Sequence, residues 1–185
     1  MALKRFPLEQ YATLELNQVA FPKTGMVVSQ TPLDNTFTKD APCENGMWVV
    51  ADKAAGVIKA PANVTDKLIG IVYTAEKEYD NFHYGLKTFG RKIAGDYPRV
   101  GLLGVGDTVT TNCLQYNTTD FADDAALDTA LKAIDTTPLY VGISAGSAVP
   151  VILKTAPANG IYAKIVKYYT VPNGEKGVKY QVVRV

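Results

Sequence analysis

The most enzyme-like motif in the chain is Gly142-Ile143-Ser144-Ala145-Gly146, which matches the G-x-S-x-G pattern of serine hydrolases. In that pattern the serine sits on a sharp turn between a strand and a helix, and a histidine later in the chain acts as its base. Here the only histidine, His83, precedes the serine, and the residues that follow the motif are typical of a strand. We therefore interpret the motif as a turn between strands and expect no catalytic residues.

A second motif, the glycine-rich segment 101–107, suggests a phosphate-binding loop. Such a loop needs Gly-Lys-Ser/Thr or a helix whose N-terminus meets the phosphate. Instead, Asp107 places a negative charge where a phosphate would bind, and a strand-like run of threonine and valine follows it. The segment is predicted to be a β-turn, and no nucleotide cofactor is expected.

Metal binding is also not expected from the residue types. One histidine and two cysteines, Cys43 and Cys113, fall short of the ligands of a closed zinc site, and we expect both cysteines to be free, buried thiols. Asp123, Asp124 and Asp128 lack the order of a calcium-binding EF-hand loop. They are better explained as helix-capping and solvated carboxylates, so the sequence predicts no metal and no cofactor.

The composition is that of a globular protein with a real core. Apolar residues make up 47% and charged residues 20% of 185, while the net charge of +1 argues against a protein held on nucleic acid by bulk charge. No stretch approaches the ~20 apolar residues that span a bilayer, and no apolar run follows Lys4 and Arg5 as it would in a signal peptide. We expect neither a membrane nor a nucleic-acid partner, and synthesis as a soluble intracellular chain.

Short runs of β-branched and aromatic residues, separated by turn residues, indicate a mainly β protein. The expected fold is a β-barrel or β-sandwich-like body with one short helix and an extended N-terminal arm. The hairpins are expected at 52–56 and 172–177, and the run 68–73 is apolar enough to be buried on both faces. The predicted strands are 25–28, 46–50, 57–60, 68–73, two within 100–113, 139–144, 149–155, 161–171 and 178–185.

One amphipathic helix is predicted after residue 119. Its apolar stripe recurs at helical spacing, and Pro138 forbids its continuation. We expect Thr119 or Asp120 to cap its N-terminus. The stripe consists of Ala125, Leu127, Ala130, Leu131 and Ile134.

The chain divides into an N-terminal arm, residues 1–24, and a β-rich body, residues 25–185, with 76–99 as a long aromatic excursion from the core. An arm of this kind must pack either on its own body or on a neighbour. The mixture of tyrosine, phenylalanine and basic residues in the excursion suits single-stranded nucleic acid or a protein interface, and its balanced charge favours the protein. The residues expected to form contacts are Phe6, Leu8, Tyr11, Leu14, Tyr79, Phe82, Tyr84, Phe89, Tyr97 and Arg99.

Charge is distributed unevenly along the second half of the chain. Residues 115–140 contain five aspartates and one lysine, whereas 160–185 contain five basic residues and one glutamate. These acidic and basic segments could meet head to tail between copies or within one copy, and the sequence leaves both arrangements open.

Several segments share a recognisable pattern with virion proteins. Residues 44–52, 57–61 and 68–72 read as a glycine-led strand, a short hairpin ended by proline, and an Ile-Gly strand, and 101–112 contains a Gly-Asp-Thr-Val strand start. The pattern resembles small tailed-bacteriophage capsid decoration (cement) proteins and related virion structural proteins. The resemblance implies a β-rich body, an arm on the capsid lattice, homo-oligomers that are commonly trimers, and no catalysis. The excursion at 76–99 departs from that family.

The expected function is therefore that of a non-enzymatic virion protein on the capsid surface. It would be synthesised in the host cytoplasm and would decorate and stabilise the capsid by binding across subunits of the major capsid protein. Self-association is expected as a homotrimer, with other oligomers left open. One alternative is a carbohydrate- or ligand-binding β-module that uses exposed tyrosines and Trp48 for stacking, although strand periodicity places Trp48 in the core. Another is a tail protein or a protein associated with head fibres.

Overall fold

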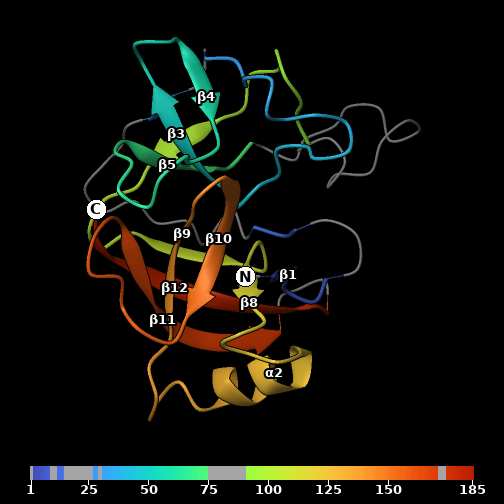
Figure 1. The fold of residues 1–185 in the computed structure, drawn as a ribbon, viewed down its shortest axis with the longest axis vertical. Coiled ribbons are helices and arrows are strands. Elements are labelled where there is room, and N and C mark those ends of the chain that lie inside the picture. Colours follow the sequence, from blue (N-terminus) through green and yellow to red (C-terminus); the bar gives the residue numbers. More distant parts are fainter. Residues whose placement is uncertain (1, 9–11, 15–26, 29–30, 75–90, 171–173) are drawn as a thin grey trace.

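A computed structural model describes residues 2–8, 12–14, 27–28, 31–74, 91–170 and 174–185. The described chain is mainly β, with two sheets and one helix, α2 (Figure 1). The two sheets do not close into a barrel. Of the two predicted folds, the β-sandwich-like arrangement is therefore the one that agrees with the structure. The five-stranded sheet lies at the top of Figure 1, the seven-stranded sheet below it, and α2 at the opposite end.

The seven-stranded sheet has the strand order β1-β8-β10-β9-β11-β12-β7. All of its pairs are antiparallel except β8 with β10, which are parallel. The antiparallel pairing of β11 and β12 confirms the predicted hairpin, and β12 begins at Lys176, two residues before its predicted start. The strands are β1 (Leu3–Arg5), β7 (Thr108–Thr111), β8 (Gln115–Asn117), β9 (Tyr140–Ser144), β10 (Ser147–Leu153), β11 (Tyr162–Thr170) and β12 (Lys176–Arg184).

The five-stranded sheet is antiparallel, with the order β2-β6-β5-β3-β4. The carboxylate of Asp52 accepts hydrogen bonds from the backbone N–H groups of Ala54 and Ala55, which fixes the predicted turn between β3 and β4. Every residue of β5 is buried, as its continuous apolar sequence predicts. The strands are β2 (Val27–Val28), β3 (Trp48–Asp52), β4 (Val57–Lys59), β5 (Ile69–Val72) and β6 (Val100–Leu102).

Two strands, β1 and β8, were not predicted. They pair antiparallel with each other, with Leu3 opposite Asn117 and Arg5 opposite Gln115. Neither sequence, Leu-Lys-Arg or Gln-Tyr-Asn, alternates in polarity or is rich in β-branched residues, so long-range pairing decides their conformation. The described start of the predicted arm is thus the edge of the seven-stranded sheet.

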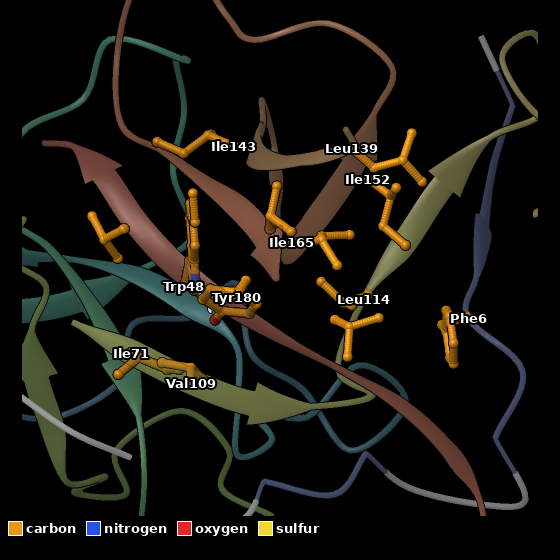
Figure 2. Packing of buried hydrophobic residues seen from close by; sticks show 14 of the residues in the cluster. Phe6, Trp48, Ile71, Val109, Leu114, Leu139, Ile143, Ile152, Ile165 and Tyr180 are labelled. Atoms are coloured by element: carbon orange, nitrogen blue, oxygen red, sulfur yellow. Dashed lines mark hydrogen bonds between the residues drawn. The ribbon is translucent and has the colours of Figure 1, made fainter. Parts of the chain in front are cut away.

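A single large cluster of buried residues joins the two sheets (Figure 2). Trp48 and Ile71 from the five-stranded sheet pack with Tyr180 and Ile165 from the seven-stranded sheet, and each is at most 1% exposed. This confirms the core position of Trp48. A second cluster lies beside the first and contains the two free thiols, Cys43 and Cys113, both fully buried as predicted.

Helix α2 (Asp124–Lys132) begins later than its predicted caps. Its N-cap is Asp123, whose carboxylate accepts a 2.8 Å hydrogen bond from the N–H of Ala126. The prediction of Thr119 or Asp120 is wrong because the N–H of Asp120 donates to the carbonyl of Asn117, in a turn that precedes the helix. The predicted apolar stripe is confirmed in part. Leu127 and Leu131 are buried, and Ala130 and Ile134 pack against the core, although Ile134 follows the end of the helix. Ala125 is exposed, so its place in the stripe is wrong.

Candidate functional site

Ser144 ends β9, and the chain turns directly into β10 rather than into a helix. Gly146 adopts a φ of 77°, and its N–H donates a 2.8 Å hydrogen bond to the carbonyl of Pro61. The G-x-S-x-G motif is therefore a hairpin turn, as predicted, whose glycine ties the two sheets together. His83 lies outside the described residues.

The glycine-rich segment between β6 and β7 is also a turn, as predicted. Gly106 has a φ of 96°, and the buried carboxylate of Asp107 accepts a 2.7 Å hydrogen bond from the N–H of Gly104. The carboxylate thus binds a backbone N–H group of the kind that a phosphate-binding loop would direct at its ligand.

The helix carboxylates are held by cations and tyrosines of the same chain. Lys4 lies 2.8 Å from Asp124, and the hydroxyl of Tyr116 donates to that carboxylate at 2.6 Å. The hydrogen bond from Lys4 has the largest effect on the pKa of Asp124, and both hydrogen bonds lower that pKa from its usual value. Among the described residues, no three His, Cys, Asp or Glu side chains gather into a group that could hold a metal ion.

Asp128 has a similar pair of partners, Lys132 at 2.5 Å and the hydroxyl of Tyr168 at 2.7 Å. Both lower its pKa, and Lys176 adds a weaker attraction. Because Tyr168 and Lys176 belong to the basic C-terminal segment, part of the acidic and basic charge meets within one copy. Other lysines of that segment do not take part.

Two of the predicted contact residues fill the core of their own chain. Phe6 is 2% and Leu14 is 4% exposed, and both belong to the large cluster. They are therefore not surface contacts, since their burial holds the N-terminal segment against the body. Leu8 is partly buried against the second cluster. The candidates outside the described residues are Tyr11, Tyr79, Phe82, Tyr84 and Phe89.

The remaining two candidates lie on the surface. Tyr97 is 60% exposed. Arg99 is also exposed, and its guanidinium lies 5.2 Å from the ring centroid of Tyr73. This stacking orients the Arg99 side chain directly before β6, near the end of the predicted aromatic excursion.

A polar groove of about 510 Å³ opens between the two sheets. The guanidinium of Arg5 lies 3.2 Å from the carboxylate of Glu44, whose side chain is only 12% exposed. Ser147 stands on the other wall, where its hydroxyl accepts a hydrogen bond from Gln115. The ion pair cancels the charges of Arg5 and Glu44, and Asp40 is the third charged residue of the lining.

A second groove, of about 410 Å³, is lined mainly by apolar side chains. Ile69 and Leu102 come from the five-stranded sheet, whereas Ile161 and Val185 flank the ends of β11 and β12. Val185 is 56% exposed. We call this site the apolar groove. It was not predicted, because its walls come from four separate segments.

Leu68 forms the rim of the apolar groove in an unusual conformation. Its φ is 55°, the only positive value at a described residue other than glycine, and its side chain is 50% exposed. A leucine pays a steric cost in this region of φ, and its exposure to water adds a second cost. Strained backbone of this kind is concentrated at binding sites, which makes the groove the strongest candidate for a functional surface.

Comparison of the chain with protein-family models, with curated proteins and with solved structures gave no match. No helix in the described ranges has the length and apolar character needed to cross a membrane.

Proposed function

We propose that this chain is a non-enzymatic structural protein of a tailed-bacteriophage virion. It decorates and stabilises the capsid by binding across neighbouring subunits of the major capsid protein. The observation that supports this proposal best is the apolar groove, whose rim residues Leu68 and Val185 are 50% and 56% exposed. The apolar walls behind these two residues are themselves buried. Exposed apolar side chains at the mouth of an apolar groove favour binding of another protein.

The proposed occupant of the apolar groove is an extended apolar segment of the capsid protein. The groove walls are mainly leucine, isoleucine and valine, and Asp66 and Lys67 add one charge of each sign at the edge. Burying apolar area contributes about 25 cal/mol per Å², so each bound copy adds cohesion between the subunits that it touches. Many copies on one shell would oppose internal pressure additively.

The positions of Ser144 and Trp48 weigh against two other functions, a serine hydrolase and a sugar-binding module that stacks its ligand on Trp48. Ser144 lies on a hairpin between strands, which lacks the strand-to-helix geometry of a hydrolase elbow. Trp48 is 1% exposed, so it offers no platform for stacking a sugar. The proposal therefore rests on surface contacts rather than on a reactive cleft.

The test is co-sedimentation with empty shells of the phage that encodes the chain. Leu68→Asn removes one of the two exposed apolar rim residues, and asparagine tolerates the positive φ, so the fold is expected to persist. Val105→Asn is the matched control, because Val105 is 41% exposed and does not line the apolar groove. We expect wild type and V105N to bind shells and raise their disruption temperature, and L68N to bind at least tenfold more weakly.

Two results would count against the proposal. If the wild-type chain does not bind shells, its role as a decoration protein is rejected. If L68N binds as tightly as wild type, the apolar groove is not the contact surface.

A further inference from the structure

Strands β11 and β12 present a positively charged face to solvent. Val178 and Tyr180 of β12 are fully buried on either side of Lys179, so Lys179 points away from the core. On β11, Lys164 likewise lies between two buried residues and is exposed. We use the name basic face for Lys164, Lys167 and Lys179 on the outer side of this hairpin.

The pairing of the two strands concentrates this charge. Lys167 stands directly opposite Lys179, and a β-bulge between Ile165 and Lys167 returns Lys167 to the same side as Lys164. Like charges in opposite positions destabilise a sheet unless another charge compensates them. Within the described ranges, none of the three lysines of the basic face forms an ion pair.

Two exposed valines accompany the lysines. Val166 is 45% and Val183 is 42% exposed, and they lie on β11 and β12 respectively. Lys167 lies 5.5 Å from the ring centroid of Tyr169. The hairpin therefore combines positive charge that no carboxylate pairs with apolar side chains that gain free energy when they are covered. This combination is typical of a protein-binding surface rather than of a solvated sheet face.

The chain itself carries the complementary surface. Residues 120–135, which we call the acidic segment, include α2 and hold five aspartates. Asp124 and Asp128 are paired with Lys4 and Lys132, whereas Asp120, Asp123 and Asp135 form no ion pair in the described part of the chain. Asp120, Asp123 and Asp135, of which Asp123 also caps the helix N-terminus, therefore supply negative charge that can pair with the lysines of the basic face.

The two surfaces face different directions in one molecule. Leu127 and Leu131 of α2 pack into the core cluster together with the inward-facing Tyr168, so the helix covers the core side of β11. The basic face lies on the other side of that strand. In Figure 1, α2 lies at one end of the molecule, below the seven-stranded sheet.

We propose that the basic face binds the acidic segment of a second copy of this chain. The contact is heterologous, because each copy uses one surface to hold the next, and repetition closes a ring or continues as a filament. The net charge of +1 leaves little long-range repulsion between copies. This inference does not depend on shell binding, and the test below uses the purified chain alone.

The test is sedimentation velocity of the full chain at low salt and at about 0.5 M NaCl, where exposed charges are largely screened. We expect association at low salt that weakens at least tenfold at high salt. The charge reversals K164E/K179E and D120K/D135K should each abolish it. K39E/K53E is the matched control for net charge, since Lys39 and Lys53 are exposed and lie outside both surfaces, and it should associate as wild type does.

Mixing the two reversed variants tests the pairing directly. K164E/K179E keeps its acidic segment and D120K/D135K keeps its basic face, and the two reversed surfaces are also opposite in charge. An equimolar mixture should therefore recover the association that neither variant shows alone. K164Q/K179Q is a milder variant that should weaken association without adding negative charge. The fluorescence of Trp48, which is buried between the sheets, reports whether each variant is folded.

Three results would overturn the inference. The first is a wild-type chain that stays monomeric at low salt. Binding of heparin or an acidic protein to the basic face of such a monomer would show that the lysines serve another partner. The second is unchanged association of K164E/K179E. The third is a folded D120K/D135K variant that associates as wild type does, because the acidic segment would then not be the partner surface.

Discussion

The indole Nε1 of Trp48 donates a 2.9 Å hydrogen bond to the hydroxyl oxygen of Tyr180, and this bond joins the two sheets inside the core (Figure 2). The two rings also meet edge to face, with centroids 5.9 Å apart. Burial raises the pKa of Tyr180, so its hydroxyl stays protonated. Because both polar groups are buried, each depends on the other for its hydrogen bond.

Tyr180→Phe should therefore destabilise the fold more than the loss of one hydroxyl at the surface. The change removes the acceptor and leaves the Trp48 N–H buried without this partner, which costs about 1–3 kcal/mol. Urea unfolding followed by fluorescence measures this directly, since Trp48 is the only tryptophan.

Tyr97→Phe is the control for that measurement, because Tyr97 is 60% exposed and its hydroxyl can bond to water. We expect its unfolding midpoint to match wild type. Equal midpoints for Y180F and Y97F would show that the buried hydrogen bond contributes nothing to stability.

Gly160 is a point of close approach between segments 157–160 and 62–66. Its φ is 76°, and a Cβ atom there would lie 1.9 Å from the carbonyl oxygen of Val64. Gly160→Ala must therefore displace backbone as well as strain φ, and we expect a loss in unfolding free energy well above the ~1–2 kcal/mol of a left-handed alanine.

Gly146→Ala separates these two effects. Gly146 has nearly the same φ, 77°, but a Cβ atom there would meet nothing within 4 Å. It should show the conformational cost alone in a urea titration. If G160A and G146A lose the same stability, the close approach of Gly160 to Val64 is not a constraint on the fold.

Local sequence patterns were sufficient to predict the strands whose residues alternate or are continuously apolar. Ala163 and Ile165 are buried and Lys164 is exposed, as period-2 alternation requires. The pattern stops predicting at the bulge after Ile165, which turns Tyr168 toward α2. Strands β1 and β8 could not be predicted because their conformation depends on pairing across more than a hundred residues.

The candidate surfaces were less predictable than the fold. The charge asymmetry was visible in the sequence, and it located the acidic segment and the basic face without showing which lysines are uncompensated. The prediction of Phe6 and Leu14 as surface contacts is wrong, because no local pattern distinguishes an apolar residue that packs on its own core from one that packs on a partner. The apolar groove could not be predicted from the sequence. No local pattern predicts the positive φ of Leu68, and the other lining residues come from distant parts of the chain.

Acid should weaken the attachment of α2 to the sheet. The pKa values of Asp124 and Asp128 are lowered in the folded chain, so their contribution is present above the unfolded pKa and is lost as pH falls through the folded values. D124N/D128N keeps acceptors for Tyr116 and Tyr168 but removes both charges. The variant should be less stable than wild type at neutral pH, and the difference should shrink as pH falls below about 4.

Urea midpoints at several pH values measure this difference, with Asp135→Asn as a control because Asp135 forms no ion pair among the described residues. A wild-type advantage that persists undiminished at the lowest pH would mean that charge on these two carboxylates does not anchor the helix.

The two buried thiols should be chemically silent in the folded chain. Burial raises the pKa of Cys113 from 9.0 to about 12 and raises that of Cys43 well above its usual value, so neither forms the reactive thiolate near neutral pH. An aromatic disulfide reagent at pH 8 should label no thiol in native buffer and two in urea. Because the unfolded thiols ionise first, stability should fall as pH rises from about 9 toward 12. Rapid labelling without denaturant would instead require that the segment around Cys43 opens readily, and the second cluster would then not be part of the stable core.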